Sequence, residues 1–239
     1  MRAFAIACLI TLSLTLSHCK KAGFFCSKGK GTSNSKAFSL DAFSRVDLRL
    51  DADLTLIQGA EQQVTVSAQN NIMKHLELTV SDGELKIDRA KCFNSHNRIL
   101  VEITVPDLQG LDMNSTGNIT TMDTFFLSRL DILHTSSGHM QVSVNLDLLN
   151  VEHRGEGNMT MIGRTHYQDV IVNAKGRYQA FGLQSDTCFI VTSASSDAEI
   201  LVDSFLDVKI RSSGNVLYKG NPNTIIEEFT GSGQLIDSN

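Results

Sequence analysis

Seven short and similar segments decide how this chain folds. They read STGNI (115–119), SSGHM (136–140), GEGNM (155–159), AKGRY (174–178), ASSDA (194–198), SSGNV (212–216) and GSGQL (231–235). The small residue at the centre of each segment, here called the marker residue, recurs at intervals of 21, 19, 19, 20, 18 and 19 residues. Six markers are glycine and one is Ser196. A fixed period of this length indicates a repeat architecture in which each repeat is one structural unit.

Positions at fixed distances from the markers keep their character from one repeat to the next. Two residues after the marker the side chains are apolar, apart from one tyrosine hydroxyl: Ile119, Met140, Met159, Tyr178, Ala198, Val216 and Leu235. Six residues before the marker they are apolar until the last repeat: Leu111, Ile132, Val151, Val170, Ile190, Val208 and then Glu227. One residue after the marker they are all polar: Asn118, His139, Asn158, Arg177, Asp197, Asn215 and Gln234. This alternation predicts strands with one buried face.

A repeat of about 20 residues with strands, turns and no helical period predicts stacked coils, because one coil cannot bury its apolar side alone. The predicted fold class is therefore all-β, a right-handed single-stranded β-helix of six to seven coils preceded by an N-terminal β segment. Stacked coils lie about 4.8 Å apart, which pairs each backbone group with the neighbouring coils. We expect the marker glycines to form corners with positive φ or close chain approach. The asparagines that follow several of them suit a left-handed conformation.

The segment before the repeats also alternates with a period of two residues. Examples are Val46, Leu48 and Leu50, and then Val64 and Val66. The sequence Ser-Asp-Gly-Glu at 81–84 has the composition of a hairpin turn, and residues 70–75 can form one helical turn. We expect one domain over residues 38–237, with N-terminal strands in 38–108 and repeated coils in 109–237. Residues 19–37, rich in Lys, Gly and Ser, are expected to form a tether.

The N-terminus has the features of an export signal. Arg2 precedes an apolar run over residues 3–16, which is too short to span a membrane. The sequence Leu-Ser-His-Cys at 16–19 resembles a bacterial lipobox, which implies a signal peptide over 1–18 and lipid attachment at Cys19. His18 stands where a small residue is usual, and a plain signal, cleaved or uncleaved, is the alternative. Lipid attachment would anchor an exported protein to the outer membrane, facing the periplasm or the cell surface.

Three cysteines remain beyond the signal and the lipid site. Cys188 lies in an apolar run, where a buried free thiol is expected. Cys26 and Cys92 lie in polar segments, and a disulfide between them would staple the N-terminal tail to the domain. No two of the three are two to four residues apart, which argues against metal binding by cysteine.

The net charge of the chain limits the classes of partner that we expect. Removal of the first 18 residues, whose only charge is Arg2, leaves 20 basic and 26 acidic residues and a formal net charge of about −6. An acidic chain of this kind is not expected to bind nucleic acid or an anionic membrane surface. The expected partner is a protein or glycan of the envelope or the environment, and the membrane is reached through the lipid.

Two groups of side chains are candidates for chemistry. His134 and His153 stand four residues before successive markers, so they should stack on adjacent coils and could share a metal. Because Met113 and Val172 hold the same position in other repeats, we favour a structural stack in the interior. His139 and His166 stand alone and are expected at the surface.

Asp51 and Asp53 flank Ala52 in a strand pattern, so their side chains lie on the same face. Such a pair could bind calcium or act as an acid and base. However, calcium needs about six or more oxygen ligands, and hydrolysis needs two carboxylates at a controlled separation. We expect no catalytic residue, metal or cofactor.

Longer segments resemble one bacterial family. They are DLRLDADLTLIQGAEQQVTVSAQNN (47–71), LELTVSDGELKI (76–87), VEITVPDLQGLDMNSTGNI (101–119) and VLYKGNPNTIIEEFTGSG (216–233), together with the recurring Ser-Ser-Gly and Gly-Ser-Gly corners. In this order they resemble the putative auto-transporter adhesin, head GIN domain family over roughly residues 38–236. The resemblance implies a secreted or lipid-anchored β-solenoid and carries over no catalytic residues.

Three hypotheses for function follow. The first is a non-enzymatic, lipid-anchored envelope protein whose coils present an adhesion-type surface for a protein or glycan. The second is a structural scaffold in the periplasm, which could stack with a second copy through unpaired strand edges. The third is a β-helix polysaccharide lyase or hydrolase, which should show an Asp cluster for calcium beside a Lys or Arg base.

Overall fold

The structure is a computed structural model that describes residues 26–94 and 96–239. The expected signal peptide (1–18), the expected lipid site Cys19 and the first part of the expected tether lie outside these residues. Within the described part of the chain, no helix has the length and apolar character needed to cross a membrane.

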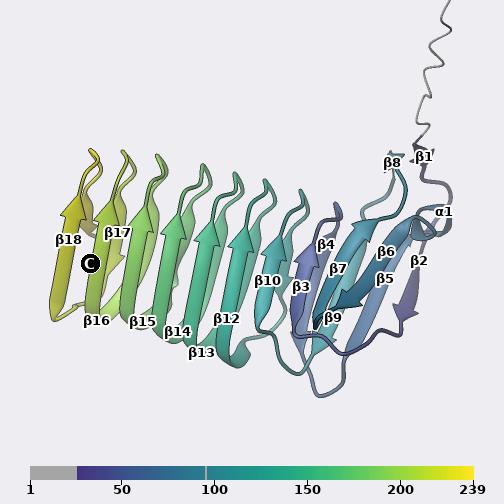
Figure 1. Cartoon of the computed structure of the whole chain (residues 1–239), viewed down its shortest axis with the longest axis horizontal. Coiled ribbons are helices and arrows are strands. Elements are labelled where there is room, and N and C mark those ends of the chain that lie inside the picture. Colours follow the sequence, from purple (N-terminus) through teal and green to yellow (C-terminus); the bar gives the residue numbers. More distant parts are fainter. Residues whose placement is uncertain (1–25, 95) are drawn as a thin grey trace, which may run out of the picture.

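Strands make up 62% of the described residues and helix 2% (Figure 1). The N-terminal part contains β1 (Ser27–Lys28), β2 (Ser33–Phe38), β3 (Arg45–Leu48), β4 (Asp53–Gln58), β5 (Gln63–Gln69), α1 (Asn70–Met73), β6 (Leu76–Ser81), β7 (Glu84–Arg89), β8 (Phe93–Asn94) and β9 (Leu100–Val105). The repeats contain β10 (Gly110–Met113), β11 (Ile119–Thr121), β12 (Phe125–His134), β13 (Met140–His153), β14 (Met159–Val172), β15 (Tyr178–Thr192), β16 (Ala198–Ile210), β17 (Val216–Lys219), β18 (Thr224–Phe229) and β19 (Leu235–Asp237).

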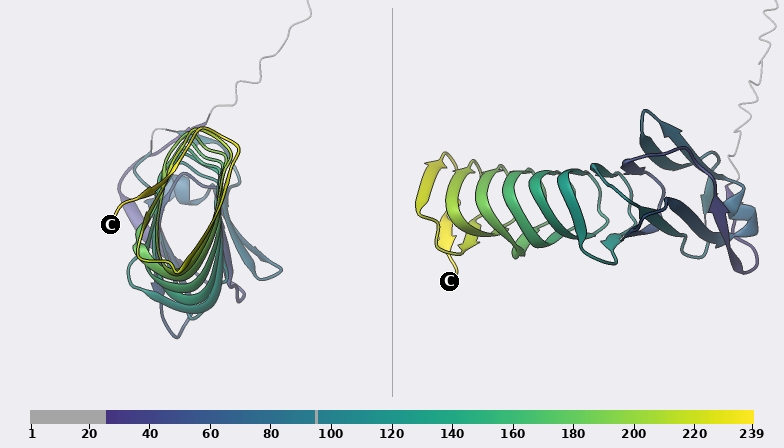
Figure 2. Two further views of the ribbon diagram at one scale, coloured as in Figure 1. Left: turned by 90° about the vertical axis from the view of Figure 1, so that its left-hand side faces the viewer. Right: turned by 90° about the horizontal axis from the view of Figure 1, so that it is seen from below.

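The repeats form stacked parallel coils, and the predicted β-solenoid is confirmed, with about 7 turns. Each repeat pairs in parallel with the next, in the register that the marker spacing predicts: Ile119, Met140, Met159, Tyr178, Ala198, Val216 and Leu235 are successive partners. Seen along the stack, the coils superimpose (Figure 2). The members of this column from Ile119 to Val216 are at most 1% exposed, so the alternating apolar residues form the core.

The long strands contribute to two parallel sheets. We call the first the β3 sheet; it pairs β3, β10, β18 and the later halves of β12 to β16, which lie side by side in Figure 1. The second, called the β4 sheet, pairs β4, β11, β17, β19 and the earlier halves of β13 to β16. Within the stack most backbone groups of the sheets find their partners in neighbouring coils, which is why a chain with little helix can bury a continuous core.

The N-terminal strands continue both sheets and then close them. Strand β7 pairs in parallel with β3, and β9 pairs in parallel with β4. The expected hairpin joins β6 to β7, with Asp82 and Gly83 at φ 53° and 73°, as a tight two-residue turn requires. The expected helical turn is α1.

The expected tether does not extend to residue 37. Strand β2 pairs antiparallel with β5 from Ser33 to Phe38, so these residues belong to the folded domain. The side chains of β2 are exposed from Ser33 to Ala37, so no apolar alternation marks it as a strand. The pairing comes from backbone hydrogen bonds at a sheet edge, which a search for hydrophobic periodicity does not detect.

The corners differ from the expectation of positive φ. Among the described glycines only Gly31, Gly83, Gly163 and Gly220 have positive φ, and none is a marker. The markers are instead sites of close approach, the second expected reason. A Cβ on Gly138 would overlap the carbonyl oxygen of Gly117, and a Cβ on Gly157 would overlap that of Gly138.

The polar residue after each marker also has a different role from the one expected. No described asparagine has positive φ, so the left-handed conformation is wrong. Five of the seven, Asn118, His139, Asn158, Asp197 and Asn215, instead accept a hydrogen bond from a backbone N–H of the next coil, and the series is interrupted at Arg177, whose guanidinium has no acceptor. The His139 N–H donates to Asn118 Oδ1 at 3.2 Å, the Asn158 N–H donates to His139 Nδ1 at 3.0 Å, and the Arg177 N–H donates to Asn158 Oδ1 at 3.0 Å. The result is a ladder of hydrogen bonds along one corner of the stack.

Candidate functional site

The outer face of the β3 sheet carries three columns of solvent-facing side chains. They stand nine, seven and five residues before the marker of each repeat, and they alternate with buried positions. In order along the stack the columns are Arg129, Leu148, Tyr167, Thr187, Phe205 and Thr224; Asp131, Asn150, Asp169, Phe189, Asp207 and Ile226; and Leu133, Glu152, Ile171, Val191, Lys209 and Glu228.

Large apolar side chains gather in the middle of this face. We call Tyr167, Ile171, Phe189 and Phe205 the outer apolar patch. Tyr167 is 54% exposed, Ile171 45% and Phe189 42%. The ring centroids of Phe189 and Phe205 are 5.7 Å apart, so the two rings are in contact. Exposed apolar residues that cluster on one face, unlike scattered ones, are typical of interaction surfaces.

A hollow of about 400 Å³ adjoins the patch on the same face. It is lined by both charge types and by apolar side chains, and its lining includes Arg45, Asp112, Arg129, Asp131, Leu133, Asn150, Glu152, Asp169 and Ile171. Strand β3 supplies Arg45, β10 supplies Asp112, and the next three coils supply the rest. Ile171 belongs to both the hollow and the outer apolar patch, so the two form one continuous surface.

Ion pairs fix the charged groups of the hollow. Arg129 Nε donates to Asp131 Oδ1 at 2.9 Å, and Asn150 Nδ2 donates to the same oxygen at 2.7 Å. Arg45 lies between Glu84, Asp112 and Asp131, with nitrogen–oxygen distances of 3.9, 4.0 and 3.7 Å. Hydrogen bonds therefore hold Arg129, Asp131 and Asn150 to one another, and Arg45 adds longer-range attraction between charges.

Burial and neighbouring groups set the pKa values of Asp112 and Asp131. Burial raises the pKa of Asp112, and the charge of Arg45 offsets this only in part. Burial also raises the pKa of Asp131, but the hydrogen bonds from Asn150 and Arg129 outweigh it, so the net pKa is below its usual value. Asp131 therefore stays ionised as a hydrogen-bond acceptor near neutral pH.

This arrangement suits recognition by shape and hydrogen bonding. The apolar patch can bury a flat or apolar surface, while the hollow offers carboxylates, amides and guanidinium groups to polar groups of a partner. Within the described residues there is no group of three or more His, Cys, Asp or Glu side chains that could hold a metal. The calcium cluster that a lyase of this architecture would need is therefore not present in that part of the chain.

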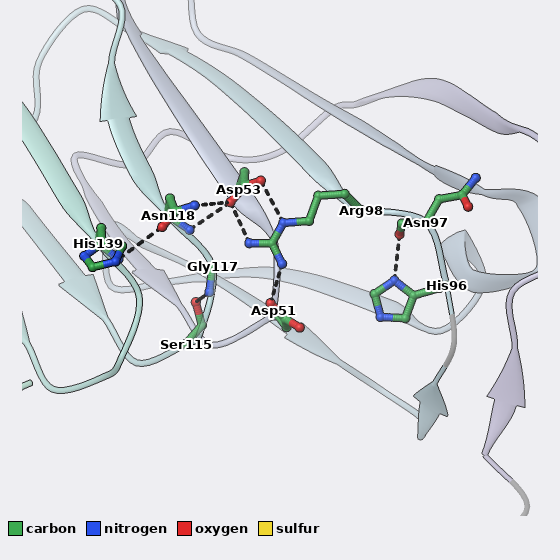
Figure 3. Close-up of polar contacts among 9 residues, drawn as sticks. All are labelled: Asp51, Asp53, His96, Asn97, Arg98, Ser115, Gly117, Asn118 and His139. Carbon is green, nitrogen blue, oxygen red and sulfur yellow. Dashed lines mark hydrogen bonds and ion pairs between the residues drawn. The ribbon is translucent and has the colours of Figure 1, made fainter. Parts of the chain in front are cut away.

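Asp51 and Asp53 lie elsewhere, and the single guanidinium of Arg98 bridges them (Figure 3). Arg98 donates from Nη1 to Asp51 at 2.7 Å, and from Nε and Nη2 to the two oxygens of Asp53 at 2.7 and 2.6 Å. The Arg98 hydrogen bonds hold the pKa of Asp53 below its usual value. Asp53 Oδ1 also accepts from the backbone and side chain of Asn118 at 2.9 and 3.1 Å. The pair thus starts the corner ladder and joins the N-terminal strands to the first coil.

The two stacked histidines occupy the interior, as the structural hypothesis predicts. The rings of His134 and His153 lie 4.8 Å apart and within 5° of parallel, and both residues are 0% exposed. Burial lowers the pKa of both, and that of His153 falls to about 4, helped by the charge of His134. None of their four ring nitrogens has a hydrogen-bond partner. The described residues supply no third ligand beside them.

The remaining candidates have structural surroundings. His139 and His166 are exposed, as expected. His139 belongs to the corner ladder, and His166 Nδ1 lies 2.6 Å from Asp186 Oδ2. The structure joins Cys26 to Cys92 by a disulfide, and Cys188 is a buried free thiol whose pKa is raised by burial.

The sequence alone did not identify the outer apolar patch. Tyr167 and Phe205 stand nine residues before their markers, and Phe189 stands seven before. Both positions are polar in most other repeats, with Leu148 and Ile226 as exceptions, and this difference is the signal that could have revealed the patch. It is weak, because an apolar residue at an outward position becomes recognisable only once the register of the coils is known.

A family model agrees with the geometry. The model described as "putative auto-transporter adhesin, head GIN domain" matches residues 42–222, most of the chain. No curated protein matches the sequence.

Solved structures share the fold at low sequence identity. A putative adhesin from Bacteroides fragilis superimposes with a TM-score of 0.84 at 18% identity, covering 87% of this chain and 98% of that one. A putative adhesin from Parabacteroides distasonis gives a TM-score of 0.70 at 20% identity, with 87% and 98% covered. A putative lipid binding protein from the same organism gives 0.68 at 17% identity, with 88% and 99% covered. At these identities the likeness concerns the fold.

Proposed function

The chain belongs to the putative auto-transporter adhesin, head GIN domain family, and on this premise we propose that it is a non-enzymatic, adhesion-type binding module of the cell envelope. The outer face of the β3 sheet is its binding surface, and its partner is a protein or a glycan. Lipid on Cys19 attaches the exported protein to the outer membrane.

One observation carries the proposal, namely the outer apolar patch beside the charged hollow. A single exposed tyrosine or isoleucine would need no explanation, but Tyr167, Ile171 and Phe189 are exposed together on adjacent coils. Aromatic residues contribute strongly to binding because they bury a large area with few rotatable bonds. The strands beneath them pair with a neighbouring strand on both sides, so we expect little loss of backbone conformational entropy on binding.

The test compares two faces of the same solenoid. Ile162 is 37% exposed on the β4 sheet and serves as the matched control. Purified parent protein, a Tyr167→Ser/Phe189→Ser variant and an Ile162→Ser variant are applied to immobilised envelope proteins and to fractionated envelope glycans. We expect the double variant to lose at least about tenfold in affinity for the bound fraction. The control should bind like the parent.

The outcome separates the hypotheses. Equal binding by all three proteins would reject the β3 face as the binding surface. Turnover of any envelope polysaccharide by the parent would reject the non-enzymatic role and favour the lyase or hydrolase. The periplasmic scaffold remains the second candidate, and the location of the domain in the cell distinguishes it.

A further inference from the structure

The two ends of the stack are built differently. At the N-terminal end the antiparallel strands β2, β5 and β6 close the sheets, and the disulfide ties the tail to β8. At the other end, shown in yellow in Figure 1, β18 pairs with β16 and β19 pairs with β17, and no described strand pairs with their outer edges. An unpaired edge of this kind is a template for pairing with another chain.

The open end also exposes the continuation of the core. Phe229 follows Ile210 in the same column; Ile210 is 0% exposed and Phe229 is 45% exposed. Ile225 likewise follows the buried Leu206 and is 36% exposed. A second copy that stacked here would cover these side chains and form hydrogen bonds with the unpaired backbone groups of the edge strands. The edge and the apolar columns by themselves therefore favour end-to-end association.

Glu227 opposes such stacking. It follows Val208 in the column that also contains Val151, Val170 and Ile190, all of which are at most 3% exposed. In every earlier coil this position points into the core. A coil placed on top of β18 would enclose the Glu227 carboxylate among apolar side chains, and an unpaired buried charge is strongly unfavourable.

The β4 sheet ends in the same way. Ala180, Ile200, Tyr218 and Asp237 are successive partners, and the first two are 0% exposed. Asp237 Oδ1 accepts hydrogen bonds from the backbone and side chain of Asn239 at 3.0 and 2.7 Å, which keep the carboxylate ionised. An acidic residue therefore stands at the last position of an inward column in each sheet, directly after the buried Val208 in the β3 sheet and after the half-buried Tyr218 in the β4 sheet.

We propose that Glu227 and Asp237 form an acidic guard that prevents the open end of the solenoid from stacking on a second copy of this chain. If the open ends of two chains met, the Glu227 and Asp237 side chains of both chains would lie in the interface. These four carboxylates would be enclosed between apolar side chains without cationic partners, and they would repel one another. An inward-pointing charge on the last strand is a recognised way to protect a sheet edge. This inference does not depend on the proposed function of the β3 face.

The test restores the apolar columns. The full chain carrying Cys19→Ala, so that lipid cannot drive association, is compared with the same chain carrying Glu227→Val/Asp237→Val. Light scattering gives the mass, small-angle X-ray scattering gives the maximum dimension, and circular dichroism verifies folding. We expect the parent to remain monomeric. The variant should show about a twofold increase in mass and in maximum dimension with rising concentration.

A control removes equal charge from outward positions of both sheets, as Glu228→Val/Glu199→Val, and should remain monomeric. A folded guard variant that stays monomeric would overturn the proposal. So would end-to-end association of the parent, or association of the control as strong as that of the guard variant. The Glu227→Val single variant is measured alongside and judged by the same criteria, so that the test does not depend on one double substitution.

Discussion

At the scale of single residues, the marker glycines matter because successive coils touch there. The preceding carbonyl oxygen occupies the space of a β-carbon at Gly138 and Gly157. Ser196 shows that one repeat has adapted to a side chain; its hydroxyl donates to the carbonyls of Ala174 and Gly176 at 3.1 and 3.0 Å. The period of these residues is readable from sequence, whereas the reason for glycine, contact rather than φ, required the structure.

The first prediction concerns Gly138. Its replacement by alanine forces the Cβ into Gly117 O, and we expect the free energy of unfolding to fall by about 3 kcal/mol. Gly182→Ala is the control, because its Cβ would meet Met161 O at 3.3 Å and the φ of Gly182 is not positive. Urea unfolding measures both. Equal stability of the two variants would contradict close approach at the marker.

The second prediction concerns the stacked histidines. The pKa of a histidine is about 6.5 in the unfolded chain, and burial lowers that of His153 to about 4 in the folded protein. Between these values the unfolded state binds more protons, so stability falls as the pH drops from about 6.5 to about 4. We expect His153 to contribute a loss of up to roughly 3 kcal/mol over this window, and no change above it.

The control for this prediction is His134→Leu/His153→Leu, which keeps an apolar column and removes both titrating groups. Several carboxylates with lowered pKa, such as Asp53 and Asp131, also stabilise the protein less once acid protonates them. The difference between parent and control therefore isolates the imidazoles. If chemical unfolding at pH 7 and pH 4.5 gives the same stability loss in both proteins, the buried neutral stack is refuted.

At the scale of elements, strands with a buried face were predictable and strands without one were not. The alternation of Val46, Leu48 and Leu50 and of the repeat columns arises from burial on one side, so the sequence carries it. Strand β2 is held by backbone pairing with β5, and its side chains are exposed from Ser33 to Ala37, so its sequence predicts a tether in place of a strand. Strand β1 is shorter still, at two residues, and pairs with β8 beside the disulfide.

The third prediction concerns that disulfide. Besides the pairing with β8, the side chain of Asn71 holds the segment: its Nδ2 donates to Lys28 O at 2.7 Å, and its Oδ1 accepts from the Lys30 N–H at 3.0 Å. Because the bridged cysteines are 66 residues apart, Cys26→Ser/Cys92→Ser should lower the free energy of unfolding by about 2–4 kcal/mol. Reduction of the parent should have the same effect, measured by urea unfolding, while the thiol of Cys188 stays unreactive until the protein unfolds. Unchanged stability on reduction would contradict a structural staple.

At the scale of the whole molecule, the solenoid is a stack of parallel coils that antiparallel strands close at the N-terminal end, with the proposed binding face along its side. The stack followed from the marker period alone. The face did not, because Tyr167 and Phe189 lie outward only in the register of the folded coils. The guard at the open end was visible in sequence as Glu227 in an apolar column, but its meaning depends on the unpaired edge of β18.

The fourth prediction concerns the attachment of the whole molecule. We expect Cys19→Ala to move the protein from the membrane fraction to the soluble fraction, since a lipid-modified N-terminus is the proposed anchor. Fractionation with a blot for the domain measures this, and Cys26→Ser is the control that should remain with the membrane. Release of both variants, or of neither, would contradict lipid attachment at Cys19. Protease treatment of intact cells then shows whether the domain faces outward or lies in the periplasm.

The most direct measurement is site-specific photo-crosslinking in intact cells. A photoreactive phenylalanine analogue is placed at Tyr167 or Phe189 on the β3 sheet, or at Ile162 on the β4 sheet, all of which are exposed. The proposed function predicts adducts of higher mass from positions 167 and 189 and none from 162. Adducts from 162 alone, equal adducts from both faces, or no adduct from 167 and 189 would show that the outer face of the β3 sheet is not the binding surface.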